Sequence, residues 1–272
     1  MQKDIFPQNA VDLGLMKKNS RIYKFFKKNE IKLLQSADIV GCTSPGNIRY
    51  FLKNYPFLDK GKLKLLYNNS KLYAPVPDPS VPDHLKNKFL VVFGGNMGKP
   101  QQLENVLNLA KKCNAYADIK FLIIGRGTEV EKLKQAAKGM EIYNLEFING
   151  MPREEYFNLL SSCNMGLISL HQDFSVPNTP MKLNDYLNAG IPVLASIDRG
   201  NDLGELLVSN KMGLYAYADS IDDLFDQFLS LYHNQELSAE MGRNGYAFCI
   251  KNLSVEKACQ DIIQHFNSNL HV

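Results

Sequence analysis

The chain of 272 residues is 45% hydrophobic, so it can bury at least one full core and is expected to form one or two domains. A formal net charge of +3 is too small to indicate a nucleic-acid partner. The N-terminal sequence MQKDIFPQNAVDLGL lacks the apolar segment of a signal peptide, and the longest uncharged stretch, Tyr156 to Gln172, is interrupted by Asn, Ser and Cys. Since the five cysteines are scattered without a CxxC pair, the composition predicts a cytoplasmic, soluble or peripheral protein with reduced thiols and no zinc.

Residues 1–72 contain too few predicted elements for a complete domain. Helices are predicted at Arg21–Leu34 and Asn47–Lys53, and short strands at Asp38–Cys42 and Leu63–Leu66. These elements cannot close a sheet around a core of their own. Two interpretations stay open: a small extension docked on the main domain, or the tail of a second lobe whose first βαβ units are absent. Residues 73–87 are predicted to form an extended linker, because Tyr73–Asp83 holds four prolines.

Residues 88–272 alternate strands with helices. Strands are predicted at Phe89–Phe93, Phe121–Ile124, Leu145–Ile148, Met165–Leu170, Ile191–Ile197 and Gly213–Ala218. Helices are predicted at Leu103–Cys113, Glu129–Met140, Glu154–Ser162, Met181–Asn188, Leu203–Ser209, Ile221–Tyr232, Ser238–Ile250 and Ser254–Phe266. Continuous apolar strands joined by single helices indicate a parallel sheet covered on both faces, hence a doubly wound, Rossmann-like α/β fold.

Two glycine-containing turns follow the first two strands of this block. Ligands of an open parallel sheet bind beyond the carboxyl ends of its strands, where these turns lie. In Gly94-Gly95-Asn96-Met97-Gly98-Lys99, glycines let backbone N–H groups approach a phosphate and Lys99 adds positive charge, although a simple tight turn is the alternative. In the second turn, Arg126 can pair with a pyrophosphate or a base edge, or be an ordinary surface arginine. The first turn is neither GxGxxG nor a P-loop, which disfavours nicotinamide cofactors and ATP hydrolysis.

The strongest motif is PNTPMKLNDYLNAGIPV, at residues 177–193. Pro180 is suited to the first turn of a helix, and the N–H groups of Met181 and Lys182 can then hold an anion at its positive end. Asp185 lies a turn further along, on the face expected to line the crevice, where a carboxylate can accept hydrogen bonds from two ribose hydroxyls. Gly190 is expected to end the helix in the left-handed region.

With these motifs in place, the block resembles the retaining glycosyltransferases of the GT-B fold, in the large family 4. The matching segments are VVFGGNMGKPQQLENVL, FLIIGRGTEVEKL, LEFINGMPREEYFNLLSSCNMGLISL, PMKLNDYLNAGIPVLAS and EMGRNGYAFCIKNLSVEKA. They cover Phe89 to about His265 in the family's order. The front segment, with DIFP, SADIVGCTSPG and KLKLLYNN, looks like the end of the family's acceptor lobe. Within the family, the chain looks closest to the N-acetylfucosamine transferases of bacterial O-antigen and capsule clusters.

The resemblance implies a UDP-sugar donor, a lipid-linked saccharide acceptor and no metal cofactor. Asp185 takes the place of the glutamate that holds the ribose in the family. Lys182, with the amides around Met181 and Leu183, would hold the diphosphate. The loop of Gly94, Gly95, Asn96 and Lys99 would cover the phosphates and the sugar.

Departures from the family pattern weaken part of this assignment. Asp185 is one methylene shorter than glutamate. Asn96 and Gln101 replace an arginine and a lysine that many members carry, so Lys99 would have to compensate. Arg126 stands where the family often has an acidic residue, and contact with the base is implied. His171 and Asp173 follow the fourth strand, either near the donor sugar or as loop residues only.

The basic helix at Arg21–Leu34 carries apolar side chains among its lysines. An interfacial helix on the inner face of the plasma membrane and a solvated helix face explain this pattern equally well. Three functions are compatible with the whole chain: a glycosyltransferase or its donor-binding fragment, a GT-B relative such as a sugar-nucleotide epimerase, and a non-catalytic nucleotide-sugar-binding module. The epimerase would need its own acid and base carboxylates, for which only Asp185 and Asp173 are candidates.

Overall fold

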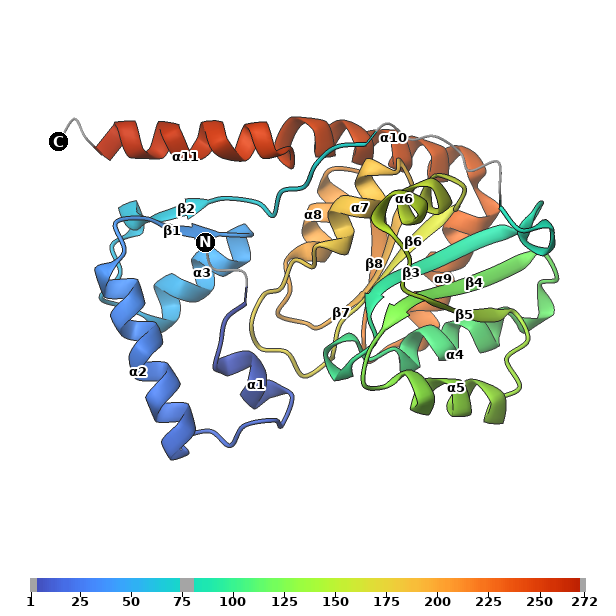
Figure 1. Ribbon diagram of the computed structural model, residues 1–272, viewed down its shortest axis with the longest axis horizontal. Coiled ribbons are helices and arrows are strands. Elements are labelled where there is room, and N and C mark those ends of the chain that lie inside the picture. The colour runs from blue at the N-terminus through green and yellow to red at the C-terminus, as the bar shows by residue number, and fades with distance from the viewer. Residues whose placement is uncertain (1–3, 74–80, 270–272) are drawn as a thin grey trace.

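The computed structural model describes residues 4–73 and 81–269 and shows two unequal parts. Residues 74–80 of the predicted linker lie outside the described residues. The larger part is a six-stranded sheet in the order β5-β4-β3-β6-β7-β8, in which every neighbouring pair is parallel (Figure 1). Its strands are β3 (Phe89–Asn96), β4 (Ile119–Arg126), β5 (Leu145–Asn149), β6 (Met165–Ser169), β7 (Val193–Ile197) and β8 (Gly213–Tyr217).

Helices cover both faces of this sheet, as the doubly wound prediction requires. One face packs on α4 (Glu104–Lys112), α5 (Val130–Gly139) and α9 (Ile221–His233). The other face packs on α6 (Arg153–Ser161), α7 (Lys182–Asn188), α8 (Leu203–Ser209) and part of α10 (Gln235–Asn252). Strands buried on both faces must be apolar throughout, which explains why their sequences do not alternate. The predicted α/β fold is confirmed.

The front segment forms a smaller unit with its own two-stranded parallel sheet. It comprises α1 (Gln8–Asp12), α2 (Arg21–Ser36), β1 (Val40–Cys42), α3 (Pro45–Asn54) and β2 (Leu63–Leu65). Its buried side chains, including Leu34, Phe51 and Leu63, belong to the same cluster as those under α7 and α8. The segment is therefore docked on the main domain through a shared core. That it is the tail of a second lobe stays a prediction.

The last helix, α11 (Val255–Asn269), leaves the main domain and extends over the front segment (Figure 1). Ile262 and Phe266 of α11 line a hollow together with Ile39 and Leu66 of the front segment. The chain thus crosses between the two parts twice, once after β2 and once along α11.

Two predicted turns begin later than expected because the strands before them are longer. Gly94–Asn96 continue β3, and Gly125 and Arg126 continue β4, with Gly95 opposite Gly125 in register. The register brings the backbones so close that a Cβ on Gly125 would lie 1.9 Å from the Gly95 carbonyl oxygen, and Gly125 also has a φ of +144°. Only glycine fits there. The short helix α1 was not predicted from the sequence.

Candidate functional site

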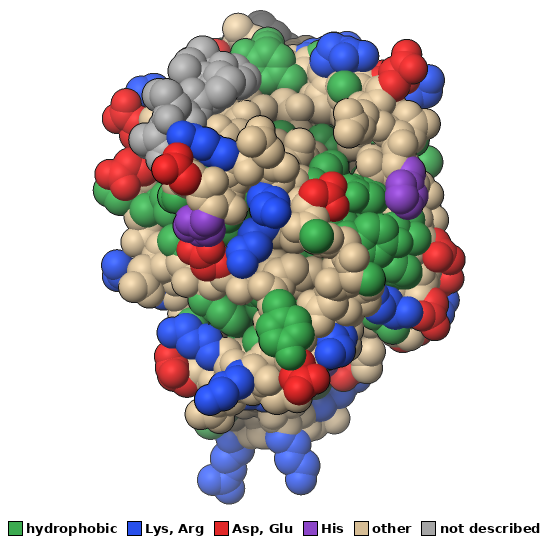
Figure 2. Space-filling view, turned by 90° about the vertical axis from the view of Figure 1, so that its right-hand side faces the viewer, with side chains coloured by type: hydrophobic (Ala, Val, Ile, Leu, Met, Phe, Trp, Pro, Cys, Tyr) green, Lys and Arg blue, Asp and Glu red, His purple; other side chains and the backbone are tan. Residues whose placement is uncertain are grey.

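A cleft of about 430 Å³ opens at the carboxyl ends of β3 and β4, on the side of the main domain that faces the front segment. It is lined by Gly94, Gly95, Asn96, Gln101, Ile124, Gly125, Gly150, Met151, Arg153, Tyr156, Met181, Lys182 and Asp185. The motifs predicted after β3 and at α7 are therefore brought together, although 85 residues or more separate them in sequence. The opposite face, where the strands begin, shows Lys and Arg side chains interspersed with Asp and Glu (Figure 2).

The glycine turn contributes fewer free amides than its sequence suggests. The Gly94 N–H donates to the Tyr186 hydroxyl at 2.9 Å, the Met97 N–H to the Arg126 carbonyl at 2.7 Å, and the Gly98 N–H to the Gln101 side chain at 3.1 Å. Gly95 and Asn96 are exposed and line the cleft. Any phosphate contact from this turn would therefore come from Gly95 and Asn96.

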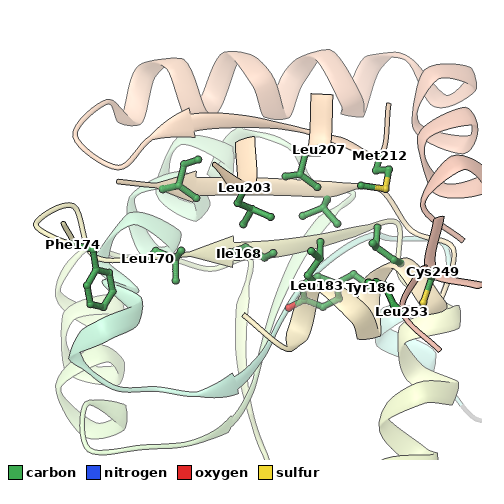
Figure 3. Packing of buried hydrophobic residues seen from close by; sticks show 14 of the residues in the cluster. Ile168, Leu170, Phe174, Leu183, Tyr186, Leu203, Leu207, Met212, Cys249 and Leu253 are labelled. Carbon is green, nitrogen blue, oxygen red and sulfur yellow. The ribbon is translucent and has the colours of Figure 1, made fainter. Parts of the chain in front are cut away.

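Helix α7 presents two different faces, which explains how it holds the site. Leu183, Tyr186 and Leu187 are fully buried and point into the core against β6, as Figure 3 shows for Leu183 and Tyr186 beside Ile168. Lys182 and Asp185 lie on the adjacent face and line the cleft. They lie together because residues three apart share a helix face.

The boundaries of α7 agree with the sequence prediction except at its first residue. The helix begins at Lys182, one residue later than predicted. Met181 directly precedes it, lines the cleft and is 41% exposed. Leu183 does not line the cleft: its side chain is in the core and its N–H donates to the Pro180 carbonyl at 3.1 Å. Gly190 ends the helix with a φ of +72°, as predicted.

The Lys182 ammonium is held at the floor of the cleft. Its Nζ lies 3.5 Å from the centroid of the Phe93 ring, a cation–π contact, and close to Gly95. Burial lowers the pKa of Lys182 to about 7, and the negative charge of Asp185 only partly opposes this shift. The group is thus poised to gain a proton when an anion enters the cleft.

The Asp185 carboxylate is paired with a residue that the sequence did not single out. Arg153, at the start of α6, donates from Nη2 to Asp185 Oδ1 at 2.8 Å. The Asp185 side chain is 13% exposed, and this burial raises the pKa of its carboxyl, while the charge and hydrogen bond of Arg153 and the charge of Lys182 lower it. Arg153 follows Pro152 inside a segment that resembles the family, but nothing in that segment indicated a partner 32 residues away.

Tyr156 is the second cleft residue that sequence analysis missed. Its hydroxyl is buried and, within residues 4–73 and 81–269, makes no well-formed hydrogen bond. It lies so close to Gly94 that a Cβ there would be 1.8 Å from the hydroxyl oxygen. The neighbouring Tyr186 hydroxyl already donates to the Leu167 carbonyl at 3.0 Å and accepts from Gly94. The Tyr156 hydroxyl thus lies buried behind Gly94 with unused bonding capacity, whereas that of Tyr186 has both a donor and an acceptor partner.

Other predicted site residues lie outside the cleft. Lys99 donates to the Leu13 carbonyl of the front segment and lines a separate hollow of about 300 Å³ that also contains His171. Asp173 is 62% exposed, with its Oδ2 3.7 Å from His171 Nδ1. Arg126 is exposed at the end of β4, near Gly150 at the rim of the cleft. Of these four residues, Arg126 is the one that adjoins the cleft lining.

Comparison with known proteins places this geometry in a family context. The family model "Glycosyl transferases group 1" matches residues 78–248. The probable glycosyltransferase WbjE of Pseudomonas aeruginosa is 26% identical over 219 residues, which is 77% of this chain and 53% of the relative. The chain spans about half the length of the curated relatives it matches.

Solved structures reproduce the fold. HepE from Anabaena, determined in complex with UDP, aligns with a TM-score of 0.74 at 15% identity, covering 90% of this chain and 69% of HepE. TarM from S. aureus, also solved with UDP, aligns with a TM-score of 0.72 at 16% identity, covering 92% of this chain and 48% of TarM. The fold of this chain therefore matches that of HepE and TarM.

Proposed function

This chain belongs to the glycosyl transferases group 1 family, and we propose that its cleft binds a UDP-sugar as the donor of a glycosyl transfer reaction. The observation that carries the proposal is the pairing of an ammonium and a carboxylate, Lys182 and Asp185, on the cleft face of α7. A nucleoside diphosphate presents the complementary groups, a diphosphate and a vicinal diol. Structural neighbours solved with UDP, including HepE, support this choice of ligand.

The cleft residues take the following roles in this proposal. Asp185 accepts hydrogen bonds from the ribose hydroxyls, and Lys182 with the amide of Met181 neutralises the diphosphate. Gly95 and Asn96 lie against the phosphates and the sugar, and Arg126 reaches the base from the rim. Lys99 joins the donor site only if it leaves the Leu13 carbonyl.

The reaction would be a retaining transfer in which the bond between the sugar anomeric carbon and the diphosphate oxygen breaks. UDP departs with the bonding electron pair, an acceptor hydroxyl oxygen bonds to the anomeric carbon, and the acceptor proton passes to the departing diphosphate oxygen. Stabilising the charge that develops on the diphosphate is the main task of the protein, and Lys182 is placed for it. We propose that no metal is needed, because Lys182 and backbone amides supply the positive charge.

For the substrates, we propose N-acetyl-L-fucosamine as the transferred sugar and a lipid-linked oligosaccharide of O-antigen or capsular polysaccharide as the acceptor. The motif resemblance supports this choice. The acceptor is likewise part of the proposal, since this chain spans about half the length of these relatives.

A non-catalytic nucleotide-sugar-binding module is the second candidate, and it makes the same donor contacts. The epimerase is less well supported, because Asp185 is the one carboxylate among the residues that line the cleft and Asp173 lies outside it. Titration calorimetry with UDP tests the donor proposal, with ADP and GDP as controls. Absence of UDP binding at millimolar concentration would reject it.

We also propose that α2 touches the inner face of the plasma membrane. Among the described helices none is long and apolar enough to cross a bilayer. Ile22, Phe25 and Leu33 of α2 are 62%, 62% and 70% exposed. Lys24 and Lys28 are exposed beside them, whereas Lys27 is committed to Glu30 and Tyr55. An anionic lipid surface would match both the exposed apolar groups and the positive charges.

Changing Lys24 and Lys28 to Gln tests this contact. Binding to vesicles that contain phosphatidylserine should weaken by about 1 kcal/mol per charge at low salt. Lys27→Gln should instead lower thermal stability, since it removes the partner of Glu30. If the double variant binds vesicles as well as the wild type does, the membrane contact is rejected, and the exposed side of α2 faces solvent only.

A further inference from the structure

The Arg153 guanidinium group makes two different contacts, one through an N–H group and one through its face. Its Nη2 donates to Asp185 Oδ1 at 2.8 Å, and its Cζ lies 4.9 Å from the centroid of the Phe157 ring. Phe157 is in turn stacked on Tyr73, with centroids 4.4 Å apart and ring planes inclined by 23°. Tyr73 belongs to the stretch that leaves the front segment, and its N–H donates to Asn188 of α7 at 3.3 Å. The guanidinium is therefore held in place, although half of the side chain is exposed.

The pairing leaves Asp185 with one committed oxygen and one available oxygen. The hydrogen bond from Arg153 goes to Oδ1, and the carboxylate lines the cleft. A planar guanidinium can donate in its plane while its face rests on an aromatic ring. Arg153 thus orients the carboxylate without filling the position that a ligand hydroxyl would occupy.

Asp185 depends on Arg153 for its charge more than on its other neighbours. Burial raises the pKa of the Asp185 carboxyl, which Arg153 and Lys182 oppose. Three more titratable groups sense its charge, Tyr156 on α6, Tyr186 on α7 and Cys249 on α10, and burial raises the pKa of each. They stay neutral near pH 7. Lys182, with a pKa of about 7, loses its charge as the pH rises, so Arg153 is the neighbour that stays cationic throughout.

We propose that Arg153 is a positioning residue of the donor site: it keeps Asp185 ionised and holds one of its oxygens, so that the other accepts a ribose hydroxyl of the nucleotide sugar. This inference rests on the proposed function, because it assumes that the cleft binds UDP. It extends that function to a residue on a different helix, which acts through Asp185.

The matched control is a second arginine with the same kind of surroundings outside the cleft. Arg199 pairs with Asp219 at 2.9 Å and lies 4.5 Å from the centroid of the Tyr217 ring. Arg199→Met removes an arginine–aspartate pair and a ring contact, as Arg153→Met does, without touching the cleft. Arg153→Lys keeps the charge and removes the planar group.

The experiment is calorimetric titration of UDP and of 2′-deoxy-UDP between about pH 5 and pH 8, with a melting curve for each variant. Arg153→Met should weaken UDP binding about tenfold at neutral pH. It should also move the loss of affinity on acidification to higher pH, because Asp185 then protonates more easily. Its effect on 2′-deoxy-UDP should be smaller, since one hydroxyl is missing. Arg153→Lys should lose UDP affinity over the same acidic pH range as the wild type, with an affinity at neutral pH between those of the wild type and Arg153→Met. Arg199→Met should match the wild type.

The outcomes separate the two proposals. If the wild type does not bind UDP, the proposed function fails, and this inference with it. If the wild type binds UDP, and Arg153→Met has the same UDP affinity and loses it over the same acidic pH range, the role of Arg153 is overturned. The proposal that the cleft binds UDP is then still supported. The phosphate groups of UDP titrate equally in every variant, so only differences between proteins are interpreted. Should Arg153→Met not fold, wild-type affinity for UDP in Arg153→Lys would overturn the positioning role.

Discussion

The cleft and the junction between the front segment and the main domain are both polar, but they use their polar groups differently. At the junction, the Asp202 carboxylate accepts from the Ser44 hydroxyl at 2.8 Å and from the Gly46 N–H. Asn47 and Asn68 donate to the carbonyls of Pro177 and Thr179, each at 2.8 Å. These hydrogen bonds join residues of the front segment to residues of the main domain and hold the two parts together.

In the cleft, by contrast, polar groups are buried or half-buried with part of their bonding capacity unused. Lys182 rests on an aromatic ring, one oxygen of Asp185 is available, and the Tyr156 hydroxyl lacks a well-formed bond. Burying such groups without partners costs free energy, so a ligand that supplies hydrogen-bond or ionic partners binds with a more favourable free energy. Changes at the junction should therefore affect stability, and changes in the cleft should affect affinity.

The largest effect should come from Asp185→Ala. The charge-assisted hydrogen bond from ribose to the available Asp185 oxygen would be lost, which is worth about 1.5–3 kcal/mol, so UDP affinity should fall by about ten- to a hundredfold. The melting temperature should change little, because the carboxylate faces the cleft and its partner Arg153 is half exposed. Calorimetric titration and a melting curve measure both quantities. An Asp185→Ala protein that melts lower yet binds UDP normally would assign the residue to the structure.

Asp185→Glu is a finer test of the same residue. If the longer carboxylate is tolerated, the distance between α7 and the ribose is that of the wider family. If UDP binding is abolished, α7 lies closer to the nucleotide and aspartate is the matched length.

Asp202→Ala tests the junction and should show the opposite pattern. The Ser44 hydroxyl and the Gly46 N–H lose their shared acceptor in a buried environment, which should lower the free energy of unfolding by about 2–3 kcal/mol. UDP affinity should stay within about threefold, since Asp202 does not line the cleft. Urea denaturation gives the first quantity, with the exposed Asp219→Ala as the control. A loss of UDP affinity larger than the loss of stability would contradict the division between the two regions.

The same contrast explains which features the sequence could predict. Periodicity placed the strands and helices, and the α7 motif placed Lys182 and Asp185 on one face of a helix at the crevice. Neither periodicity nor motifs could predict contacts between distant segments. Lys99 was predicted to face the phosphates, but its ammonium is committed to Leu13, 86 residues earlier. Arg153 reaches Asp185 from another helix, 32 residues away in sequence. Such pairings depend on how elements approach in space, which local patterns do not record.

Measuring UDP affinity as a function of pH tests the role of Lys182. The expected change in affinity is smaller than that in Asp185→Ala and larger than that in Lys99→Met. The pKa of Lys182 is lowered to about 7 in the free protein, and a bound diphosphate should raise it. Only the protonated form attracts the diphosphate, so the contribution of Lys182 to affinity should be full below pH 7 and should fall up to about tenfold per unit as the pH rises above it. UDP binding at about pH 8 should therefore take up close to one proton. Calorimetry in buffers of different ionisation enthalpy measures this uptake.

Lys182→Met is the control for the proton uptake. It should weaken UDP binding less than Asp185→Ala, because backbone amides at the start of α7 remain, and it should remove the pH dependence above pH 7. Proton uptake that persists in Lys182→Met would show that another group titrates.

Lys99→Met should have the smallest effect on affinity and gives the sharpest comparison with Lys182. Both lysines were predicted to serve the diphosphate, but Lys99 lines a separate hollow and donates to the Leu13 carbonyl. Its removal leaves that carbonyl with one partner fewer, so the free energy of unfolding should fall by about 1 kcal/mol. UDP affinity should stay within about twofold of the wild type, as expected for a residue away from the site. A tenfold loss of affinity in Lys99→Met would mean that Lys99 leaves Leu13 when the nucleotide binds. The front segment would then belong to the donor site as well as to the junction.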